Sequence, residues 1–347
     1  MLMANTEPLY GKTPDELSEL CARLGLPRYA PRQIARWLYV RAVADPAAMT
    51  DLSRAAREAL AAACDPGLAP PEREWLSADG TKKYLYRTRA GHYVESAFIP
   101  DGDRATLCVS SQAGCRMGCR FCATGRQGLQ ASLTAGEILN QIASLPERER
   151  LTNLVFMGMG EPLDNIDNVL RALEILTAPW GFAWSPTRIT VSTSGVTPAL
   201  PRLLDRTKVH LAVSLHNPFS DERAEIMPVE RAYPIAGVAE LLRRYDFTHQ
   251  RRVSFEYIVL SGLNDTPRHI RGLCRLLDGI KCRINLIRFH KIPGSPYFSP
   301  PDEELIRFRD TLTAKGIQTT IRASRGEDIQ AACGLLSTRE QQQHAQQ

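Results

Sequence analysis

The segment that decides the fold spans residues 115–125, and its sequence is Cys115-Arg116-Met117-Gly118-Cys119-Arg120-Phe121-Cys122-Ala123-Thr124-Gly125. Iron–sulfur clusters are held by cysteine thiolates, and most take four of them. Three cysteines this close together, with no fourth cysteine nearby, predict a 4Fe-4S cluster bound by Cys115, Cys119 and Cys122. Such a cluster leaves one iron without a protein ligand, and that open iron can bind a substrate.

Two simpler interpretations of these cysteines remain open. A structural zinc site needs four protein ligands, and the residues that follow offer no histidine or cysteine at the usual spacing. Ordinary packing cysteines are the other alternative. The spacing CxxxCxxC, with Phe121 before the third cysteine, resembles the radical S-adenosylmethionine (radical SAM) superfamily. In that superfamily the amino and carboxylate groups of SAM chelate the open iron.

The composition indicates one large catalytic domain with a small appendage. The chain has 347 residues, more than the roughly 250 of a single α/β barrel. It contains no apolar run of about 18 residues, and its first twelve residues lack the layout of a signal peptide. Nine unevenly spaced cysteines do not indicate the disulfide framework of a secreted protein. We therefore expect a cytoplasmic protein with no membrane partner.

Two stretches near the cysteine motif carry basic residues and no acidic ones. Residues 104–136 contain four arginines, and residues 279–301 contain Lys281, Arg283, Arg288, His290 and Lys291. Solvated surfaces usually mix both signs of charge. The formal net charge of +5 also permits a nucleic-acid partner. Both stretches therefore predict a polyanion close to the cluster.

From residue 104 onward, strand-like apolar runs alternate with helical patterns, which is typical of parallel βα units. The expected strands cover residues 105–110, 153–157, 188–192, 209–215, 253–259 and 283–289, with a seventh at 318–321 and a short helix at 327–333. We predict an α/β fold, a partial (β/α)6 radical SAM barrel that forms the catalytic core over residues 101–336. The tail, residues 337–347, is polar and is expected to be disordered.

Residues 1–64 predict a small helical accessory domain that binds RNA. A capping box, Thr13-Pro14-Asp15-Glu16, opens the first helix, and further helices are expected at 32–43 and 52–63. The second helix carries basic and aromatic side chains, so it contacts RNA or packs as an ordinary amphipathic helix. Residues 65–100 are expected to form a linker and a short β-hairpin that acts as a hinge.

Polar residues follow several expected strands, at the end where parallel barrels carry their active residues. In Gly158-Met159-Gly160-Glu161, the glycines let backbone approach a ligand, and the carboxylate can bind an ammonium group. Read alone, the same motif is also a simple strand-to-helix turn. His216 is either a satisfied core histidine or a ligand contact, and the buried amide of Asn285 needs a partner that a cofactor can supply. The predicted cofactor-binding residues are Gly160, Glu161, Ser192, Ser214, Leu215, His216 and Asn285.

Several motifs together resemble the RlmN/Cfr family of radical SAM enzymes. They include residues 95–100, 104–112, 157–162 and 331–334, in addition to the cysteine motif, and the match covers nearly the whole chain. Enzymes of this family methylate a carbon of adenine in ribosomal RNA, and the RlmN branch also acts on transfer RNA. Taken alone, Cys108 and Cys333 are ordinary buried cysteines. The resemblance gives both of them chemical roles.

The resemblance implies that Cys333 accepts a methyl group from one SAM molecule. A second SAM molecule yields a deoxyadenosyl radical, which removes hydrogen from that methyl group, and the resulting carbon radical adds to the adenine. Cys108 then forms a transient disulfide with Cys333 and releases the product. Glu95 matches the position of the residue that accepts the ring proton. The implied partners are ribosomal RNA, transfer RNA and an electron donor such as flavodoxin or ferredoxin, and we expect a monomer.

The sequence departs from the family pattern at two places. Residues 288–291 are Arg288-Phe289-His290-Lys291 where relatives have a turn with proline and asparagine, and Leu129 replaces an aromatic residue. These changes keep open a Cfr-like enzyme that methylates carbon 8 of adenine. A radical SAM activase or maturase for a peptide or small molecule is a second alternative, although no second cysteine cluster is present. A zinc-bound RNA-binding module is a third.

Overall fold

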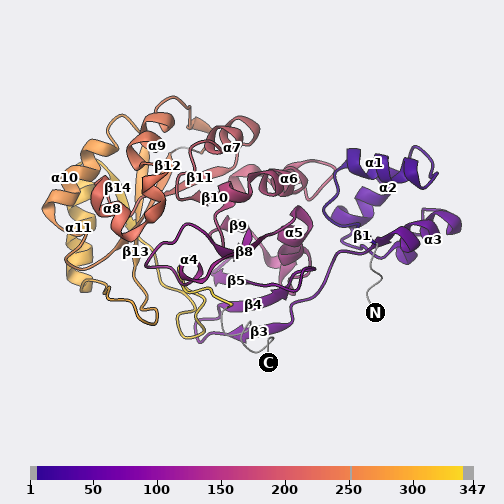
Figure 1. Ribbon diagram of the computed structural model, residues 1–347, viewed down its shortest axis with the longest axis horizontal. Coiled ribbons are helices and arrows are strands. Elements are labelled where there is room, and N and C mark those ends of the chain that lie inside the picture. The colour runs from indigo at the N-terminus through magenta and orange to yellow at the C-terminus, as the bar shows by residue number, and fades with distance from the viewer. Residues whose placement is uncertain (1–5, 251, 339–347) are drawn as a thin grey trace.

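The computed structural model describes residues 6–250 and 252–338, and its centre is one large sheet (Figure 1). The parallel strands of this sheet are β6 (Arg104–Cys108), β9 (Asn153–Phe156), β10 (Ile189–Thr193), β11 (His210–Ser214), β12 (Val253–Val259), β13 (Cys282–Arg288) and β14 (Gln318–Ile321). Each parallel strand pairs with the next one along the chain. The partial (β/α) barrel is therefore confirmed, and each expected strand is found within two residues of its expected bounds.

Three antiparallel strands extend the sheet beyond β6. They are β5 (Tyr93–Asp101), β4 (Lys82–Arg87) and β3 (Arg73–Leu76), so the full order is β14-β13-β12-β11-β10-β9-β6-β5-β4-β3 within the described residues. The expected hairpin is β4 and β5, and the sequence analysis missed β3. In the pairing of β5 with β6, Ala97 lies opposite Cys108. The hairpin therefore continues directly into the catalytic sheet.

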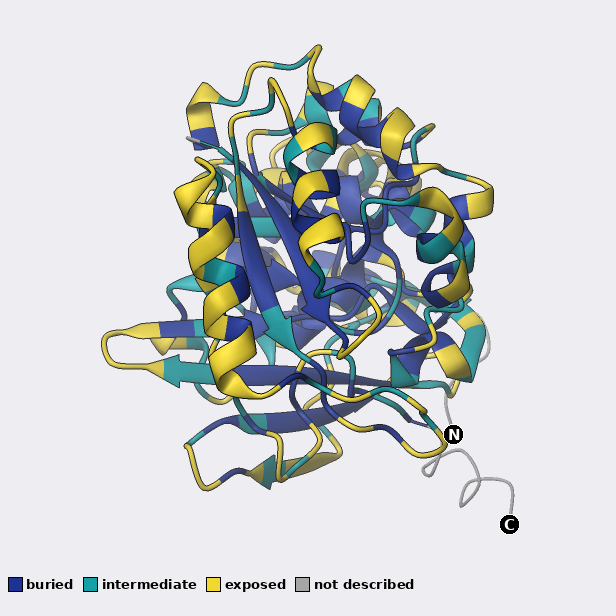
Figure 2. Cartoon of the chain, turned by 90° about the vertical axis from the view of Figure 1, so that its left-hand side faces the viewer, coloured by how far each residue is buried: buried dark blue, intermediate teal, exposed yellow. Residues whose placement is uncertain are grey.

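Helices surround the barrel strands, and Figure 2 shows buried strands at the centre with exposed outer helix faces around them. All seven residues of β12 are buried, as expected for a parallel strand covered on both sides. Helix α5 begins at a capping box formed by Thr134 and Glu137. The helices of the barrel are α5 (Ala135–Ala143), α6 (Ile166–Thr177), α7 (Leu200–Arg206), α8 (Ser220–Ile226), α9 (Ile235–Leu242), α10 (Pro267–Leu276) and α11 (Asp302–Ala314).

The N-terminal helices gather at one end of the molecule, beside α5 and α6 (Figure 1). Helix α1 (Pro14–Arg23) begins at the expected capping box, and α3 (Arg54–Ala63) corresponds to the helix expected at residues 52–63. Helix α2 (Ala30–Ala35) starts earlier than expected and continues as one π-helical turn, Arg36–Val40. Strands β1 (Glu7–Pro8) and β2 (Cys64–Asp65) pair and close this unit.

Contacts with α5 and α6 help to fix the helical unit against the barrel. A Cβ on Gly11 would lie 2.5 Å from the backbone nitrogen of Gly136, so these two backbone segments approach each other as closely as glycine allows. Arg171 of α6 forms an ion pair with Glu16 of α1 at 2.9 Å. Because the contact with α5 is between backbones, the position of the helical unit relative to the barrel is fixed.

Two local predictions differ from the structure. The helix expected at 327–333 is wrong, because these residues form successive turns and Gln330 has a left-handed φ of 54°. The sequence analysis also missed a hairpin, β7 (Gln112–Cys115) with β8 (Gly128–Ser132), which encloses the cysteine loop and α4 (Ala123–Gln127). Residues 339–347 of the expected disordered tail lie outside the described residues. Thr338 is buried and accepts a hydrogen bond from Gln127 at 2.9 Å.

Candidate active site

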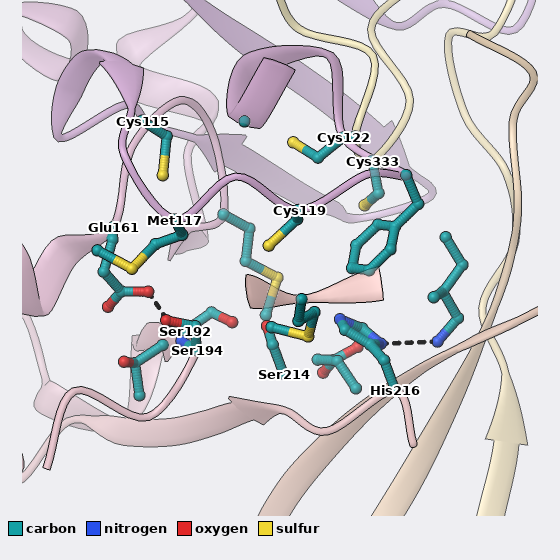
Figure 3. A pocket seen from close by; sticks show the side chains of 18 of the residues that line it. Cys115, Met117, Cys119, Cys122, Glu161, Ser192, Ser194, Ser214, His216 and Cys333 are labelled. Atoms are coloured by element: carbon teal, nitrogen blue, oxygen red, sulfur yellow. Dashed lines mark hydrogen bonds between the residues drawn. The ribbon is translucent and has the colours of Figure 1, made fainter. Parts of the chain in front are cut away.

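The three cysteines of the motif line one cavity at the carboxyl ends of the parallel strands (Figure 3). The cavity has about 890 Å³ of empty space, which falls within the usual size of small-molecule sites. Residues that follow β9, β10 and β11 form its other walls. Of the predicted site residues, the structure brings together Cys115, Cys119, Cys122, Gly160, Glu161, Ser192, Ser214, His216 and Cys333.

Backbone hydrogen bonds hold the cysteine loop in place between β7 and α4. The Arg120 N–H donates to the carbonyl of Ile226 at 2.9 Å, and the Ala123 N–H donates to the carbonyl of Gly334 at 2.7 Å. The loop is thereby tied both to the end of α8 and to the turn that carries Cys333. No part of this anchoring uses the cysteine thiols themselves, which remain available to a bound group.

The cysteine thiols are suited to a cationic cluster. Burial raises the pKa of Cys115 to about 12, and burial also raises the pKa values of Cys119 and Cys122. Buried thiols ionise readily when a metal supplies positive charge. Within residues 6–250 and 252–338, no three His, Cys, Asp or Glu side chains converge on a site for one metal ion. A four-iron cluster gives each thiolate its own iron, so the donor set fits a cluster.

The Glu161 carboxylate faces the same cavity from the turn after β9. Its Oε2 accepts a hydrogen bond from the Ser194 N–H at 2.8 Å, and its Oε1 accepts one from the Leu163 N–H at 3.0 Å (Figure 3). Burial raises the pKa of this carboxyl above its ordinary value. Each oxygen has a second lone pair, so the group is fixed in position and can still accept from an ammonium ligand.

The glycines before Glu161 serve the packing of the protein. A Cβ on Gly158 would lie 2.7 Å from the carbonyl oxygen of Val109, and one on Gly160 would lie 2.6 Å from the Cβ of Gln112. The close approach that these glycines allow is therefore to the chain that follows β6. Gly160 also has a φ of 98°, which favours glycine.

The sequence left open whether His216 is a core histidine with its hydrogen bonds satisfied or a residue that contacts a ligand, and the structure has features of both. Its backbone has a left-handed φ of 58°, and its Nδ1 accepts from the Ile258 N–H at 2.9 Å (Figure 3). Burial lowers the pKa of His216 to about 3, so the ring is neutral and carries its proton on Nε2. The ring is satisfied on one side and lines the cavity, where it packs edge-on against Phe121.

Two predicted cofactor-binding residues do not line the cavity. The side chain of Leu215 is buried in the hydrophobic core. The amide of Asn285 donates to Glu256 Oε1 at 2.8 Å and accepts from Thr320 Oγ1 at 2.9 Å. The partners that this buried amide needs are supplied by the protein, and Glu256 rather than Asn285 faces the cavity.

A buried ion pair, which was not predicted from the sequence, joins the ends of β10 and β11. Arg223 has no exposed surface and pairs with Glu230. Its guanidinium also donates to the carbonyls of Ser194 at 2.9 Å, Ser214 at 2.8 Å and Leu215 at 2.8 Å. The pair therefore fixes the backbone on which the cavity residues stand. In the sequence, Arg223 lies in the charged run Asp221-Glu222-Arg223, which gives no sign of burial.

Cys108 and Cys333 lie on the wall of a second cavity, which adjoins the first. This cavity has about 1380 Å³ of empty space, and Cys122 and Cys333 line both cavities. Cys108 is buried at the end of β6, whereas Cys333 is exposed on the turn after β14. Burial, together with the neighbouring Cys333, raises the pKa of Cys108 to about 12. Cys108, near the start of the catalytic core in sequence, and Cys333, near its end, therefore line the same cavity.

Arg322 is a second residue that the sequence analysis missed. It follows β14, lines both cavities and forms an ion pair with Glu256 at 3.1 Å. The charge of Glu256 raises the pKa of Arg322, and the thiols of Cys333 and Cys108 act in the same direction. A fixed cation therefore stands beside both thiols. No motif in the sequence distinguishes this arginine from the others of the chain.

Glu95 lies near the thiols but outside both cavities. It precedes Ala97 by two residues in β5, and Ala97 is the partner of Cys108 in the sheet. Side chains two residues apart share one face of a strand, so Glu95 is on the face that carries Ala97. Its carboxylate forms an ion pair with Lys83 at 3.0 Å and accepts from the Ser337 N–H at 3.0 Å.

Three cysteines on a cavity at the carboxyl ends of a partial barrel, beside a fixed carboxylate, define the class of radical SAM enzymes. Residues 109–274 match the Radical SAM superfamily. Residues 8–65, which include the three N-terminal helices, match the ribosomal RNA large subunit methyltransferase N-terminal domain. The protein is therefore a radical SAM enzyme, with a 4Fe-4S cluster and SAM as its cofactors.

The chain belongs to the RlmN family of RNA methyltransferases. It is 55% identical to the probable dual-specificity RNA methyltransferase RlmN of Bacteroides fragilis, over 97% of this chain and 98% of that protein. It is 42% identical to the dual-specificity RNA methyltransferase RlmN of Syntrophus aciditrophicus, over 93% and 94%. A crystal structure of a radical SAM methyltransferase from Sphaerobacter thermophilus superimposes with a TM-score of 0.88 and 44% identity, covering 95% of this chain and 99% of that one.

Proposed function

We propose that the protein methylates carbon 2 of an adenine in RNA, with ribosomal and transfer RNA as its substrates. The observation that carries the proposal is the position of Cys333, which lines both the cavity of the three cluster cysteines and the cavity of Cys108. One thiol can therefore meet SAM on one side and RNA on the other. Relatives named as dual-specificity RNA methyltransferases support the substrate class.

A radical route suits the target atom. Carbon 2 of adenine lies between two ring nitrogens and is electron-poor, so it does not attack a sulfonium methyl group as an amine would. A bound and reduced cluster would supply the electron that splits SAM into methionine and a hydrogen-abstracting deoxyadenosyl radical. Cys115, Cys119 and Cys122 would hold the cluster, and Glu161 would bind the amino group of SAM. Ser192, Ser214 and His216 line the space left for the rest of that molecule.

Cys333 would carry the methyl group. Its exposed thiol would lose a proton and accept a methyl group from a first SAM, which would leave as S-adenosylhomocysteine. Loss of one hydrogen atom from that methyl group would allow its carbon to add to the base. The base is then bonded through the new carbon to the sulfur of Cys333. The adduct would return one electron to the cofactor and lose the ring proton. The thiolate of Cys108 would then attack the sulfur of Cys333. The carbon–sulfur bond breaks, its electron pair goes to the carbon, which takes up a proton and becomes the methyl group, and a disulfide is left between the two cysteines. Cys108 is suited to this step because it lines the same cavity as Cys333.

Glu95 would accept the ring proton of the base. In the structure, Lys83 and the Ser337 N–H both contact its carboxylate, and the side chain has no exposed surface. Proton removal therefore requires the Ser337 segment to withdraw when RNA binds. The ion pair with Lys83 holds the carboxylate in position until then.

The second cavity is suited to an extruded base with its phosphates. Its lining includes Arg104, Arg288, His290, Arg322 and Arg325. Asp302 and Asp101 pair with Arg288 and Arg325, and Glu256 pairs with Arg322. A base must leave its stack to reach thiols inside a barrel, and basic side chains at the rim can hold the flanking backbone. The N-terminal helices would supply the rest of the RNA contact.

One observation favours a second product. Arg288 and His290, which lie in the stretch that departs from the family pattern, line the cavity proposed for the base. A base turned by these side chains would present carbon 8 to Cys333, as in the Cfr branch. Carbon 2 remains our proposal because the similarity to proteins named RlmN extends over 97% of the chain.

We also propose that a flavodoxin or ferredoxin reduces the cluster and that the protein works as a monomer. Arg116 and Arg120 lie within the cysteine motif, and their side chains are 61% and 55% exposed, although Asp164 and Glu225 form ion pairs with them. Acidic electron carriers dock on basic surfaces through complementary charge. These two side chains are therefore the expected contact for the donor.

The test uses anaerobically reconstituted protein, a reductant, methyl-labelled SAM and RNA that lacks the modification. Nucleoside mass spectrometry of ribosomal and transfer RNA then identifies the methylated carbon. Label on carbon 2 is the expected result, and label on carbon 8 would replace the proposal with the Cfr-like alternative. SAM cleavage without any labelled RNA would exclude RNA as the substrate.

A further inference from the structure

A third cavity lies at the opposite end of the barrel from the cysteines. It has about 1120 Å³ of empty space, and its lining includes the first residues of β11 and β14 and the second residues of β12 and β13. It therefore opens at the amino ends of the parallel strands. The chemistry described above takes place at their carboxyl ends, so this cavity has no part in it.

The lining of this cavity is polar throughout. Thr187, Ser254 and Gln318 contribute hydroxyl and amide groups, and Arg252, Arg283, His210, His249 and Gln250 complete it. Within the described residues, no aliphatic or carbocyclic aromatic side chain lines the cavity. Small-molecule sites for bases or acyl groups are mostly apolar. The lining therefore fits a ligand that consists of charged and hydrogen-bonding groups alone.

Positive charge is in excess around the cavity. Burial lowers the pKa of Arg283, Glu256 opposes this effect, and Arg252, Arg322 and Arg104 lower it further. Glu256 already pairs with Arg322. Among the described residues, no carboxylate forms an ion pair with Arg252 or Arg283. Among these residues, two guanidinium groups thus line the cavity without an ion-pair partner of their own.

Gln250 supplies an independent sign of a ligand. Its side chain is buried, with 5% exposure, and its Oε1 accepts from the Leu211 N–H at 2.6 Å. Its Nε2 is buried and has no hydrogen-bond partner within the described residues. Buried polar groups in proteins are nearly always satisfied. An acceptor bound in the cavity would satisfy this donor.

We propose that this cavity is a binding site for a phosphate-class oxyanion, held by Arg252, Arg283 and the amide of Gln250. Arginine side chains bind phosphate oxygens through paired hydrogen bonds. The Nε of Arg283 donates to Ser254 at 2.8 Å, and this bond orients the guanidinium. The oxyanion is either free phosphate or diphosphate, or a backbone phosphate of bound RNA. In each case it neutralises the cations at the amino end of the barrel.

The test measures binding of inorganic phosphate and of diphosphate to the reconstituted holoenzyme. Isothermal titration calorimetry gives the stoichiometry, and melting temperatures are compared with chloride at equal ionic strength. We expect one saturable site and a melting temperature that rises with phosphate concentration. Equal effects of phosphate and chloride, or no saturable heat, would overturn the proposal.

Variants locate the site. Gln250→Glu keeps the acceptor for Leu211 and places a negative charge where the unpartnered donor stands, and Arg283→Gln removes a cation. Each should weaken phosphate binding by about 10- to 100-fold, from the loss of one charge-assisted hydrogen bond. Arg252→Gln provides the same test if either variant does not fold. The exposed Arg271, on α10, supplies the control Arg271→Gln, which should bind as the wild type does.

A second titration assigns the source of the oxyanion. If Gln250→Glu weakens the binding of unmodified RNA as well as of phosphate, the site holds a backbone phosphate. If it weakens phosphate binding alone, the ligand is a free oxyanion. Wild-type affinity for phosphate in both Gln250→Glu and Arg283→Gln would show that the anion binds elsewhere, and the proposal would fail.

Discussion

The two walls of the active cavity are held in different ways. The wall that carries Glu161, Ser192 and Ser214, called here the cofactor wall, stands at the ends of regular strands. Arg223 of the buried Arg223–Glu230 pair donates to the carbonyls of Ser194 and Ser214 and so joins the ends of two of these strands. The wall that carries Cys333 is a succession of turns without helix or strand. Burial and charge fix the first wall, whereas a small number of hydrogen bonds position the second.

Before Cys333, two carboxylates anchor this wall to the turn between β3 and β4. Asp79 in that turn accepts from the Gly326 N–H at 2.9 Å. In the other direction, Asp328 accepts from Ser77 Oγ at 2.6 Å and from the Ala78 N–H at 3.1 Å. These anchors are exposed or half-buried, so each contributes little to stability. The difference between the walls matches their proposed tasks, because SAM needs a preorganised site and Cys333 must serve SAM, RNA and Cys108 in turn.

The largest predicted effect concerns the thiol of the Cys333 wall and the thiol of Cys108, which both line the second cavity. Cys333→Ala should reduce methylation of RNA and of the protein itself to background, because no other sulfur carries the methyl group. Cys108→Ala should still allow addition to the base but not the release step, so RNA stays covalently bound to the protein. Gel electrophoresis of labelled RNA under denaturing conditions, together with nucleoside analysis, measures both outcomes.

Cys274→Ala is the matched control, because this cysteine is half-buried in α10 and lines neither active cavity. It should methylate RNA at the wild-type rate. Normal turnover by the Cys108 variant would remove the disulfide step from the proposal. An adduct formed by Cys333→Ala would show that another residue carries the methyl group.

The fold was predictable because its signals are local. Apolar runs such as residues 253–259 are buried on both faces, and the capping boxes at Thr13 and Thr134 each begin a helix. The cysteine loop and the turn with Glu161 follow directly from strand ends, so their convergence on one cavity follows from parallel topology. Most residues of the cofactor wall could therefore be predicted from their positions at the ends of strands.

The contacts that span the chain were not predictable in this way. Arg223 and Glu230 are an ordinary pair of charges in sequence, and their burial depends on the carbonyls of Ser194 and Ser214. Asn285 looked like a ligand because it is polar in an apolar strand, but its partners come from the neighbouring strands. The turns at 327–333 have helix-forming composition, yet tertiary hydrogen bonds hold them in another conformation.

Removal of the buried Arg223–Glu230 ion pair should weaken the cofactor wall. Arg223→Met should lower the free energy of unfolding by about 3–5 kcal/mol, because the Glu230 carboxyl group is left buried without its partner. The double variant Arg223→Met/Glu230→Leu should recover part of that loss. Chemical denaturation monitored by circular dichroism measures both.

The control for this prediction is an exposed pair. Arg244 and Glu240 are four residues apart at the end of α9, and both side chains are 67% exposed. Arg244→Met should cost at most about 0.5 kcal/mol. Equal losses from Arg223→Met and Arg244→Met would mean that burial does not distinguish the cofactor wall.

A smaller effect concerns the reactivity of the Cys108 thiol. Burial raises the pKa of Cys108 to about 12, so only a small fraction is thiolate at neutral pH, and thiolate is the reactive form. Where the release step limits the rate, it should become about tenfold faster per pH unit between pH 7 and 9. Single-turnover decay of the RNA–protein adduct at several pH values measures this slope. A flat profile would mean that another step or another proton donor limits release.

The smallest predicted effect loosens the Cys333 wall without touching a thiol. Asp79→Asn weakens the bond to the Gly326 N–H, at a cost of about 0.5–1.5 kcal/mol, and should slow methylation about 2- to 10-fold while the cofactor wall stays intact. Asp310→Asn, at an exposed carboxylate on α11, should leave the rate unchanged. SAM binding that falls together with methylation would show that the two walls are not independent.

The pH dependence of stability tests the same anchor. Burial acts to raise the pKa of Asp79, but hydrogen bonds from Gly326 and Thr81 outweigh it and lower the pKa to about 2. The carboxylate binds its proton less readily in the folded state, so its contribution is complete above about pH 4 and is lost between pH 4 and 2. The difference in unfolding free energy between the wild type and Asp79→Asn should therefore be constant above pH 4 and shrink below it. A difference that persisted at pH 2 would show that the Asp79 charge does not anchor the wall, and that Cys333 is held instead through the Gly334 carbonyl and the cysteine loop.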